Sequence, residues 1–463
     1  MLINGEWIES KEKLEVRNPY NGDLIDYINI TQPDQVTIAC EHAKQFQSKL
    51  TSYERSKILA NTADDIEKQA EIYQKSIVLE SGLSLKDAKK EVKRAVTLLK
   101  VCSEEAKRIN GESIYTDITE GSSKNLAITI REPIGLVCAI TPFNRPLNQI
   151  VVKLGPAIAA NNSIILKPSE KTPLTAIKFV KTLIDNGLPQ KMVSIVTGKP
   201  DIIGDLLIKN PHIDMITFTG SAVIGEHIAM TAGMIKTTFE LGDSGALIVM
   251  NDAKVEKAIK VAVAGAFATS GQSCRGIKRI YVDEKIKHSF INQFVEKTKQ
   301  LKVGDPMDPE TDIGVLINEE SAIAIQKRID QAVEKGAKIE LGGIRKNSQI
   351  LPTILSNVPQ DADIVQKETF GPCAPIISFS TLKEVIDLTN DTPYGLQTGI
   401  FTNSISDAMY AAKRLKVGAV AINNGPQFDS PNIPFGGVKK SGLGREGVKY
   451  AINEMTTVKT IIL

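Results

Sequence analysis

Between residues 130 and 250 the chain alternates short apolar runs with longer segments in which apolar residues recur at helical spacing. The runs at 134–140, 163–167 and 215–218 are mostly apolar, and helical patterns follow at 147–160 and 222–232. Strands that are apolar on both faces are typical of a parallel sheet covered by helices on each side. This part of the chain therefore predicts a doubly wound α/β unit.

A second alternating block runs from residue 255 to about 422, with strand candidates at 279–282 and 419–422. Since 463 residues are too many for one simple core, two or three domains are expected. The predicted fold class is thus α/β, with two doubly wound parallel-sheet domains. Residues 7–110, in contrast, are expected to be mostly helical, because long charged amphipathic patterns run through them.

Three segments resemble exposed strands that lie outside these two units. They are 113–118, 126–131 and 458–463, and the second of them alternates cleanly between polar and apolar residues. We expect them to form a small β arm. Unpaired strand edges usually find a partner, so the arm predicts a homo-oligomer, either a homodimer or a homotetramer.

The composition narrows the class of protein. The formal net charge is only +2, from 56 basic and 54 acidic side chains, which gives no reason to expect nucleic acid or a membrane as a partner. The first residues lack the pattern of a signal peptide, and no window approaches the ~20 apolar residues of a membrane helix. The sequence therefore predicts a cytoplasmic protein.

The five cysteines are too scattered to form a recognisable framework. No two of them stand at Cys-x-x-Cys spacing, which argues against both a disulfide scaffold and a structural zinc site. No metal is expected. For any one of them a small buried hydrophobe is the ordinary interpretation, and only Cys274 has a context that suggests chemistry.

Cys274 lies in a glycine-containing turn, Ser270-Gly-Gln-Ser-Cys274, at the end of a helix-like run of small residues. Upstream, Glu240 ends a short strand-like run in Phe239-Glu-Leu-Gly242. A thiol that attacks a carbonyl and a carboxylate that later activates water are the two groups that an acyl-transfer enzyme needs. Cys274 and Glu240 are therefore the first catalytic candidates.

Asn144 is a third candidate, because it stands in a rigid turn. Pro142 and Pro146 flank it after a buried strand and restrict the backbone, so that the amide points in a fixed direction. An amide N–H aimed at a developing oxyanion is one use of such rigidity. A plain loop asparagine is the alternative.

Two strand ends offer nucleotide-binding chemistry. Phe218-Thr-Gly-Ser-Ala-Val-Ile-Gly225 follows a strand and opens a helix, whose free N–H groups and dipole suit a pyrophosphate. An ordinary strand-to-helix turn with Ser221 as N-cap is equally compatible. Lys167 and Glu170 follow another strand, at the edge where open α/β sheets bind ligands, although a solvated charge pair would look the same.

The chain also contains a match to G-x-G-x-x-G at Gly442-Leu-Gly-Arg-Glu-Gly447. That fingerprint requires an apolar strand before it and a ribose-binding acid roughly 20 residues later. Here a loop precedes it and the sequence ends 16 residues after Gly447. We interpret it as turn chemistry.

Taken in order, the motifs resemble those of the aldehyde dehydrogenase superfamily. They are Asn144 between prolines, Lys167-Pro-Ser-Glu170, Phe218-Thr-Gly-Ser221, Phe239-Glu-Leu-Gly242, Gly271-Gln-Ser-Cys274, Glu368-Thr-Phe-Gly-Pro372 and Pro434-Phe-Gly-Gly-Val-Lys-Lys-Ser-Gly442. Each motif alone is weak, but seven in this order are very specific. The resemblance extends over essentially the whole chain, from Asn4-Gly-Glu-Trp7 onwards.

The resemblance implies a role for each candidate. Cys274 would attack the aldehyde, and the Asn144 amide with the Cys274 N–H would hold the oxyanion. A thioester would remain after hydride transfer, and Glu240 would activate the water that hydrolyses it. It also implies an NAD-binding domain over 1–111 and 133–250, a catalytic domain over 251–425, and an oligomerisation arm over 112–132 and 448–463.

The implied cofactor is NAD, with NADP possible. By resemblance, Lys167 and Glu170 would contact the adenosine ribose, Ser221 the pyrophosphate and Glu368 the nicotinamide ribose. The same motifs add Gly220, Gly225 and Phe370 to the cofactor residues. A carboxylate at Glu170 would repel a 2′-phosphate, which favours NAD over NADP.

One position departs from the family pattern. Where the family usually continues after Gly242 with Gly and a polar residue, this chain has Asp243-Ser-Gly245. A second carboxylate facing the site would raise the pKa of Glu240 further. The interpretation adopted is that Asp243 points away from the site.

The chain resembles the branch of the family that acts on small polar aldehydes. Candidate substrates are lactaldehyde, glyceraldehyde 3-phosphate, succinic semialdehyde and phosphonoacetaldehyde. Arg94, Arg145 and Arg275 could anchor an anionic group bidentately, or could be structural. Two alternatives stay open: a CoA-acylating dehydrogenase, which would not need Glu240, and a catalytically silent scaffold.

Overall fold

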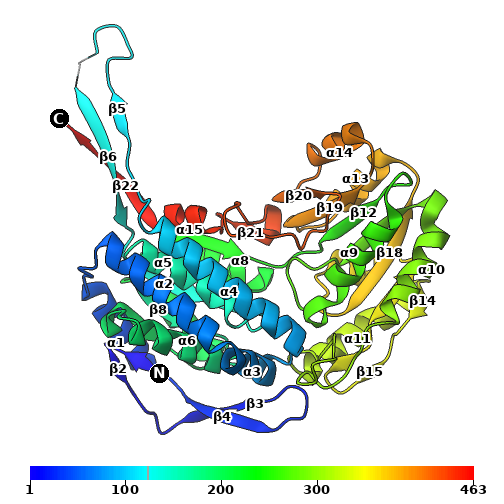
Figure 1. Ribbon diagram of the computed structural model, residues 1–463, viewed down its shortest axis with the longest axis horizontal. Helices are drawn as coiled ribbons and strands as arrows, with labels where there is room; N and C mark the ends of the chain where they lie inside the picture. Colours follow the sequence, from blue (N-terminus) through cyan, green and yellow to red (C-terminus); the bar gives the residue numbers. More distant parts are fainter. Residues whose placement is uncertain (123–124) are drawn as a thin grey trace.

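The computed structural model describes residues 1–122 and 125–463, and it is an α/β protein built on two parallel-rich sheets. Figure 1 shows the two sheets with their helices side by side and a narrow arm projecting from the first. Residues 123–124, which belong to the expected arm, lie outside the described residues.

The first sheet has eight strands within the described residues, in the order β2-β1-β9-β8-β7-β10-β11-β21. Its parallel centre is β9-β8-β7-β10-β11. The bounds are β1 Leu2–Ile3, β2 Glu6–Trp7, β7 Leu136–Ile140, β8 Ser163–Lys167, β9 Val193–Ile195, β10 Met215–Thr219, β11 Lys236–Glu240 and β21 Gly442–Leu443.

Successive residues of one strand enter two different cores, which is the reason that these strands are apolar throughout. Along β7, Val137 and Ala139 belong to one cluster, while Leu136 and Cys138 belong to another. The helices associated with this sheet are α1 Pro33–Gln45, α2 Ser52–Lys68, α3 Ala70–Ser81, α4 Leu85–Glu105, α5 Asn148–Ala159, α6 Pro173–Asp185, α7 Pro200–Ile208, α8 Ala222–Thr231 and α15 Val448–Glu454. The doubly wound arrangement predicted for this part of the chain is therefore confirmed.

The second sheet has seven strands within the described residues, in the order β14-β17-β18-β13-β12-β19-β20. These are β12 Ala246–Val249, β13 Arg279–Asp283, β14 Lys338–Leu341, β17 Thr353–Ser356, β18 Cys373–Phe379, β19 Gln397–Phe401 and β20 Ala419–Ile422. Its helices are α9 Val255–Phe267, α10 Lys287–Thr298, α11 Glu319–Glu334, α12 Asp363–Gln366, α13 Leu382–Asn390 and α14 Ile405–Ala412. All its pairs except β14·β17 are parallel.

The projecting arm is a three-stranded antiparallel sheet of the order β22-β6-β5. Its strands are β5 Ser113–Tyr115, β6 Leu126–Pro133 and β22 Thr456–Ile462. Residues 448–454, which the sequence placed with the arm, form α15 instead, and Val448 and Ile452 of that helix are buried in the core of the first sheet. The C-terminal strand of the arm, β22, begins only at Thr456.

The expectation of a mostly helical segment at 7–110 needs one correction. Helices fill most of 33–105, but β3 Lys13–Arg17 and β4 Leu24–Asn29 form an antiparallel ribbon before them. Most residues of this ribbon are exposed or half-buried, so its sequence lacks the apolar pattern that marks the other strands. Two small strands, β15 Arg345–Lys346 and β16 Gln349–Ile350, form a further hairpin.

None of the helices in the described part of the chain has the length and apolar character needed to cross a membrane.

Candidate active site

Three strands of the first sheet end at one edge and carry candidate residues there. Glu240 is the last residue of β11 and pairs with Thr219, the last of β10; Lys167 ends β8 opposite Ile140 of β7. Asn144 follows β7 after a short turn. Because parallel strands point the same way, all these residues meet at the carboxyl edge of the sheet, where α/β proteins bind ligands.

The turn that carries Cys274 has an unusual backbone. After α9 ends, Thr269, Ser270 and Gly271 all have positive φ, at 55°, 53° and 70°. Asp87 of α4 holds the turn, since its carboxylate accepts a hydrogen bond of 2.8 Å from the Thr269 N–H. A Cβ at Gly271 would lie 2.0 Å from the carbonyl oxygen of Gly371, so only glycine fits there. The turn is fixed in position relative to α4.

A cavity of about 310 Å³ brings together the carboxyl edge of the first sheet and this turn. The candidate residues that line it are Asn144, Gly220, Ser221, Glu240, Cys274, Glu368 and Phe370. The first four come from the first sheet, and the others come from segments associated with the second sheet. All three catalytic candidates thus line one cavity.

Asn144 is tied directly to the turn of Cys274. Its buried side-chain amide donates a hydrogen bond of 2.9 Å to the carbonyl of Gln272. An amide NH₂ has two hydrogens, so the second remains free to donate into the cavity. The donor is therefore bonded to Gln272, which stands two residues before the thiol in the chain.

Cys274 is a partly exposed free thiol in the cavity wall. Burial raises its pKa to about 11, and the charge of Arg275 opposes this shift while that of Glu240 adds to it. The resting form at neutral pH is therefore the thiol. Attack requires that a proton leave Sγ, which a neighbouring base must accept.

Glu240 is a buried carboxyl group that is not held by other side chains. It is 4% exposed, and neither of its oxygens has a hydrogen-bond partner among the described residues. Burial raises its pKa well above the usual value, and the charge of Glu446 raises it further, while the charge of Lys153 lowers it. A carboxyl group with these properties is suited to act as a general base near neutral pH.

The second carboxylate that acts on Glu240 is Glu446 rather than Asp243. Lys153 of α5 is 1% exposed and donates 3.0 Å to Glu446 and 3.1 Å to Thr217. The Asp243 carboxylate instead accepts the backbone N–H groups of Leu396 and Gln397, each at 3.3 Å. Asp243 thereby caps the start of β19, in agreement with the expectation that it points away from the base.

Glu368 and Phe370 form the opposite wall of the same cavity. One carboxylate oxygen of Glu368 accepts the Asp243 N–H at 3.2 Å. Burial raises its pKa to about 7, and the charge of buried Lys278 opposes the shift. The Phe370 ring lies edge-on to Phe143, with centroids 6.1 Å apart. An acceptor beside an apolar face suits a ribose joined to a flat heterocycle.

Ser221 is the N-cap of α8, because its hydroxyl accepts a hydrogen bond of 3.4 Å from the Ile224 N–H. Ser221 also lines the cavity. The helix N-terminus that it marks suits a phosphate group. Gly225, one turn later, does not line the cavity. A Cβ there would lie 2.6 Å from the Leu241 side chain, so Gly225 permits close packing of α8 on the segment after β11.

Lys167 and Glu170 also lie outside the cavity wall, although they belong to the same sheet edge. The Lys167 Nζ lies 3.9 Å from the Glu170 carboxylate. Burial lowers the pKa of Lys167, and the charge of Glu170 opposes this. The pair suits the two hydroxyls of a ribose more distant from Cys274, because it offers one donor and one acceptor.

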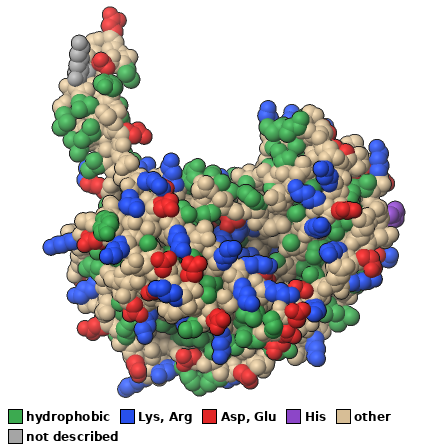
Figure 2. Space-filling model, viewed as in Figure 1, with side chains coloured by type: hydrophobic (Ala, Val, Ile, Leu, Met, Phe, Trp, Pro, Cys, Tyr) green, Lys and Arg blue, Asp and Glu red, His purple; other side chains and the backbone are tan. Residues whose placement is uncertain are grey.

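A second cavity, of about 460 Å³, is lined by residues that neighbour those of the first in the chain. It is lined by Ser273 and Arg275, which flank Cys274 in the chain, and by Arg145, which follows Asn144. Arg94 of α4 is the third arginine in its wall. Figure 2 shows a hollow in the middle of the molecule with Lys and Arg side chains around it.

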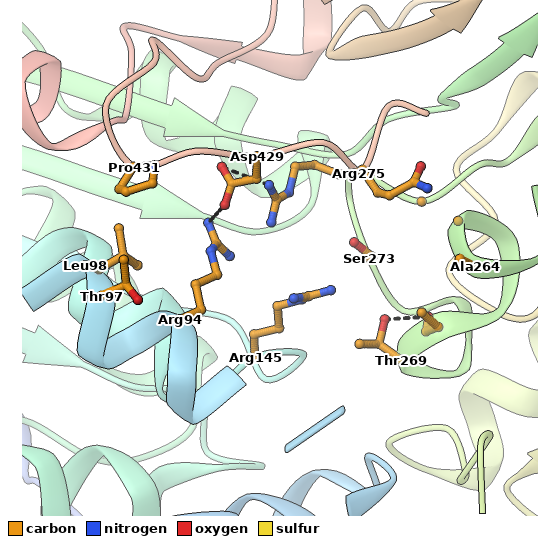
Figure 3. Close-up of a pocket in the computed structure, with 14 residues that line it drawn as sticks. Arg94, Thr97, Leu98, Arg145, Ala264, Thr269, Ser273, Arg275, Asp429 and Pro431 are labelled. Atoms are coloured by element: carbon orange, nitrogen blue, oxygen red, sulfur yellow. Dashed lines mark hydrogen bonds and ion pairs between the residues drawn. The ribbon is translucent and has the colours of Figure 1, made fainter. Parts of the chain in front are cut away.

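Asp429, in the loop between β20 and β21, joins two of the three arginines. Its carboxylate lies 2.5 Å from Arg94 and 3.0 Å from Arg275. Figure 3 shows these two guanidinium groups converging on Asp429, while Arg145 extends into the space below them. Among the described residues Arg145 has no ion-pair partner. Burial lowers the pKa of Arg94 to about 10, and the charge of Arg275 lowers it further.

The structure adds four residues that the sequence did not single out: Gln272, Glu446, Lys153 and Asp429. Gln272 lies within the Gly271–Cys274 motif and Glu446 within Gly442–Gly447, but no local pattern indicates the side chains that they contact. Lys153 had a weak signal, a lone cation in the apolar pattern of a helix. Asp429 had none, because its loop has no periodic pattern.

Comparison with known proteins places this geometry in a family. The sequence model described as the aldehyde dehydrogenase family matches residues 7–461. A 3-sulfolactaldehyde dehydrogenase from Priestia aryabhattai is 42% identical over 464 residues, which cover 100% of this chain and 97% of that protein. A lactaldehyde dehydrogenase from Methanococcus aeolicus is 41% identical over 472 residues, covering 100% and 99%.

A solved structure agrees with the sequence comparisons. The glyceraldehyde-3-phosphate dehydrogenase GapN from Methanocaldococcus jannaschii, complexed with NADP, superposes with a TM-score of 0.94 at 39% identity, covering 98% of this chain and 100% of that one. The similarity extends over both sheets and the arm, since it includes nearly every residue. The chain belongs to the aldehyde dehydrogenase family.

Proposed function

We propose that the protein oxidises a small anionic aldehyde to the carboxylic acid with NAD(P)⁺, and that Cys274, Asn144 and Glu240 carry the chemistry. The observation that carries the proposal is that these three side chains line one cavity, while the adjoining cavity presents three arginines. An aldehyde whose anionic end lies among the arginines would have its carbonyl carbon near Cys274.

The first covalent step is attack of the Cys274 sulfur on the aldehyde carbon. Glu240 is the base in the cavity wall that can accept the thiol proton, because its oxygens are otherwise unpaired. The oxyanion of the thiohemiacetal is stabilised by the free N–H of the Asn144 amide and by the Cys274 backbone N–H. The chemistry that NAD(P)⁺ supplies is acceptance of a hydride, which converts the thiohemiacetal into a thioester.

The second step is hydrolysis of the thioester on Cys274. Glu240 first releases the thiol proton to solvent, and it then takes a proton from water as the water attacks the acyl carbon. The carbon–sulfur bond breaks, and the departing sulfur takes that proton from Glu240 to restore the thiol. The raised pKa of Glu240 matches this task, because a carboxylate of ordinary pKa is too weak a base near neutral pH.

The residues present suit a nicotinamide dinucleotide. Glu368 and Phe370 would hold the nicotinamide riboside, Gly220 and Ser221 the pyrophosphate, and Lys167 with Glu170 the adenosine ribose. The Glu170 carboxylate favours NAD⁺, since it would repel a 2′-phosphate. The similar structure from Methanocaldococcus jannaschii holds NADP, so both cofactors belong in the assay.

The arginine cavity supports an anionic substrate rather than a neutral one. Among the expected aldehydes, glyceraldehyde 3-phosphate and succinic semialdehyde carry an anion, as does sulfolactaldehyde, for which the similar Priestia protein is named. Lactaldehyde would leave Arg145, which has no ion-pair partner among the described residues, without a counter-charge. We therefore rank the anionic aldehydes before lactaldehyde.

We also propose that the active form is a homodimer or homotetramer. The arm exposes Ile114, Tyr115, Ile462 and other apolar side chains, and its outer strands have free edges. Multi-angle light scattering would measure the mass in solution, and a mass of one chain would contradict the proposal.

The direct test is a spectrophotometric screen for NADH and NADPH formation. The substrates are glyceraldehyde 3-phosphate, sulfolactaldehyde, succinic semialdehyde, phosphonoacetaldehyde, lactaldehyde and simple alkanals, each with and without CoA. We expect the free acid as product and no dependence on CoA. An acyl-CoA product would favour the CoA-acylating alternative, and failure with every aldehyde would overturn the proposal.

A further inference from the structure

Asp429 is the one acidic residue in the wall of the arginine cavity. Arg94, Arg145 and Arg275 contribute three positive charges there, and Asp429 contributes one negative charge. Outside the wall, Glu446 is paired with the buried ammonium of Lys153 at 3.0 Å, and the charges of Arg145 and Arg94 lower the pKa of buried Glu91, which burial raises. The cavity wall of the described residues therefore carries a net charge of about +2.

The position of Asp429 determines which guanidinium N–H groups remain available to a ligand in the cavity. Its two oxygens engage one guanidinium from α4 and one from the Cys274 turn, so that both are held in place from one side. Each guanidinium keeps further N–H groups for a ligand. Arg145 has no ion-pair partner among the described residues, and Figure 3 shows its side chain below those of Arg94 and Arg275. An anion that enters would lie between Arg145 and the Asp429-bound pair.

Asp429 is ionised under ordinary conditions. Burial raises its pKa, but the charges of Arg275 and Arg94 outweigh burial and lower the pKa below the usual value. A fixed negative charge therefore stands beside the place where the anionic end of the substrate binds. Its repulsion is weaker for a monoanion than for a dianion, because Coulomb energy scales with the product of the charges.

We propose that Asp429 tunes substrate specificity, because its negative charge lowers the preference of the arginine cavity for a doubly charged phosphate relative to a singly charged sulfonate or carboxylate. The inference rests on the proposed function of this cavity as the site for the anionic end of an aldehyde. A phosphate monoester carries about −1.5 to −2 charges at pH 7, with a second pKa near 6. A sulfonate carries one charge at every accessible pH.

The test compares two three-carbon 2-hydroxyaldehydes, sulfolactaldehyde with a sulfonate on carbon 3 and glyceraldehyde 3-phosphate with a phosphate ester there. We would measure kcat/KM for both with the wild-type protein and with Asp429→Asn, which keeps the shape of the side chain. The ratio of phosphate to sulfonate kcat/KM should rise about tenfold in Asp429→Asn. Asp361→Asn is the matched control, since it removes a charge from an exposed surface ion pair and should leave the ratio unchanged.

The dependence on pH supplies a readout that loss of structure would not produce. In the wild-type protein the ratio should fall as the pH falls through 6, because the phosphate then becomes a monoanion and loses part of its attraction to a wall of net charge about +2. In Asp429→Asn that fall should be steeper, because the wall then carries one more net positive charge. An unchanged ratio in Asp429→Asn, or equal losses for both substrates, would overturn the role of Asp429 even though the enzyme oxidises both aldehydes.

A binding measurement keeps the inference testable if no aldehyde is turned over. Calorimetric titration with 3-sulfolactate and 3-phosphoglycerate, the corresponding acids, should give tighter relative binding of the phosphate to Asp429→Asn than to wild type. Equal affinity ratios in the two proteins would contradict the inference. Inactivity toward every aldehyde, in contrast, would count against the proposed function and not against this charge selection.

Discussion

The side-chain amide of Asn144 donates a 2.9 Å hydrogen bond to the backbone carbonyl of Gln272, two residues before Cys274. Asn144 follows a strand of the first sheet, while Gln272 belongs to the turn after α9. The bond therefore sets the distance between the oxyanion donor and the thiol across two separately built parts of the protein. Neither part alone holds the complete site.

Replacement of Asn144 by Ala should lower kcat by about 10²–10³, the usual cost of losing one oxyanion donor. The reason is that one N–H would no longer face the developing charge, and the turn of Cys274 would lose an anchor. Steady-state kinetics with saturating aldehyde measures the effect. Asn186→Ala removes an amide that bonds Asp65 and Thr182 instead, and it should leave kcat unchanged. Full activity in Asn144→Ala would contradict the assignment.

Glu446→Gln should shift the acidic limb of the pH–rate profile to lower pH. Glu240 acts as a base only when ionised, so activity is lost as the pH falls through its raised pKa. The charge of Glu446 contributes to that raised pKa, and its removal lowers the pKa, so that ionised Glu240 persists to lower pH. The profile of log kcat against pH measures the shift.

A matched variant gives the opposite sign. Lys153→Met removes a positive charge that lowers the pKa of Glu240, so the acidic limb should move to higher pH. If both variants move the limb in the same direction, the electrostatic explanation of the base is wrong.

Arg145→Ala should raise KM for an anionic aldehyde roughly tenfold or more, while kcat changes little. A charge-assisted hydrogen bond contributes about 1.5–3 kcal/mol, and Arg145 has no internal ion pair whose loss would complicate the result. KM for a neutral alkanal should stay the same. Arg108→Ala, at an exposed pair with Glu104 and Glu105, serves as the control. A uniform rise in KM for neutral and anionic aldehydes would exclude an anion anchor.

Gly225→Ala should destabilise the fold by about 1–3 kcal/mol, the usual cost of overpacking. A Cβ at this position of α8 would meet Leu241 at 2.6 Å. Gly204 in α7 offers a direct comparison, because a Cβ there meets nothing within 4 Å and Ala is the better helix former. Gly204→Ala should therefore be neutral or stabilising. Chemical denaturation measures both, and equal stability of the two variants would remove the packing role of Gly225.

The sequence predicted the two doubly wound sheets well because their strands are apolar on both faces, as along β7 and β12. It missed β3 and β4, since an exposed two-stranded ribbon has no such signature. The motif residues around Cys274 and Glu240 were found through a family resemblance that depends on local letters. The positions of Glu446 and Asp429 beside them depend on long-range folding of the C-terminal loop, which no local pattern records.

In Gly442-Leu-Gly-Arg-Glu-Gly447, too, the local sequence predicts the turn, whereas long-range contacts decide what its residues touch. The segment is indeed not a strand-to-helix phosphate loop, because a single 3-10 turn precedes it. However, Gly442 pairs with Glu240 in the sheet, and Glu446 reaches Lys153. The local sequence is that of a turn, and the pairing of Gly442 with Glu240 is visible only in the structure.

The central claim is that an acyl group passes through Cys274 and that Glu240 releases it. Rapid mixing of Glu240→Gln with an accepted aldehyde and NAD(P)⁺, followed by quenching and mass spectrometry of the intact protein and its peptides, tests this directly. We predict that cofactor reduction stops after about one equivalent per active site, at a rate that rises with pH as the Cys274 thiol ionises without Glu240, because hydrolysis has also lost its base. An acyl adduct should then be found on the peptide that contains Cys274. Steady turnover at the wild-type rate with no adduct on Cys274 would contradict the account.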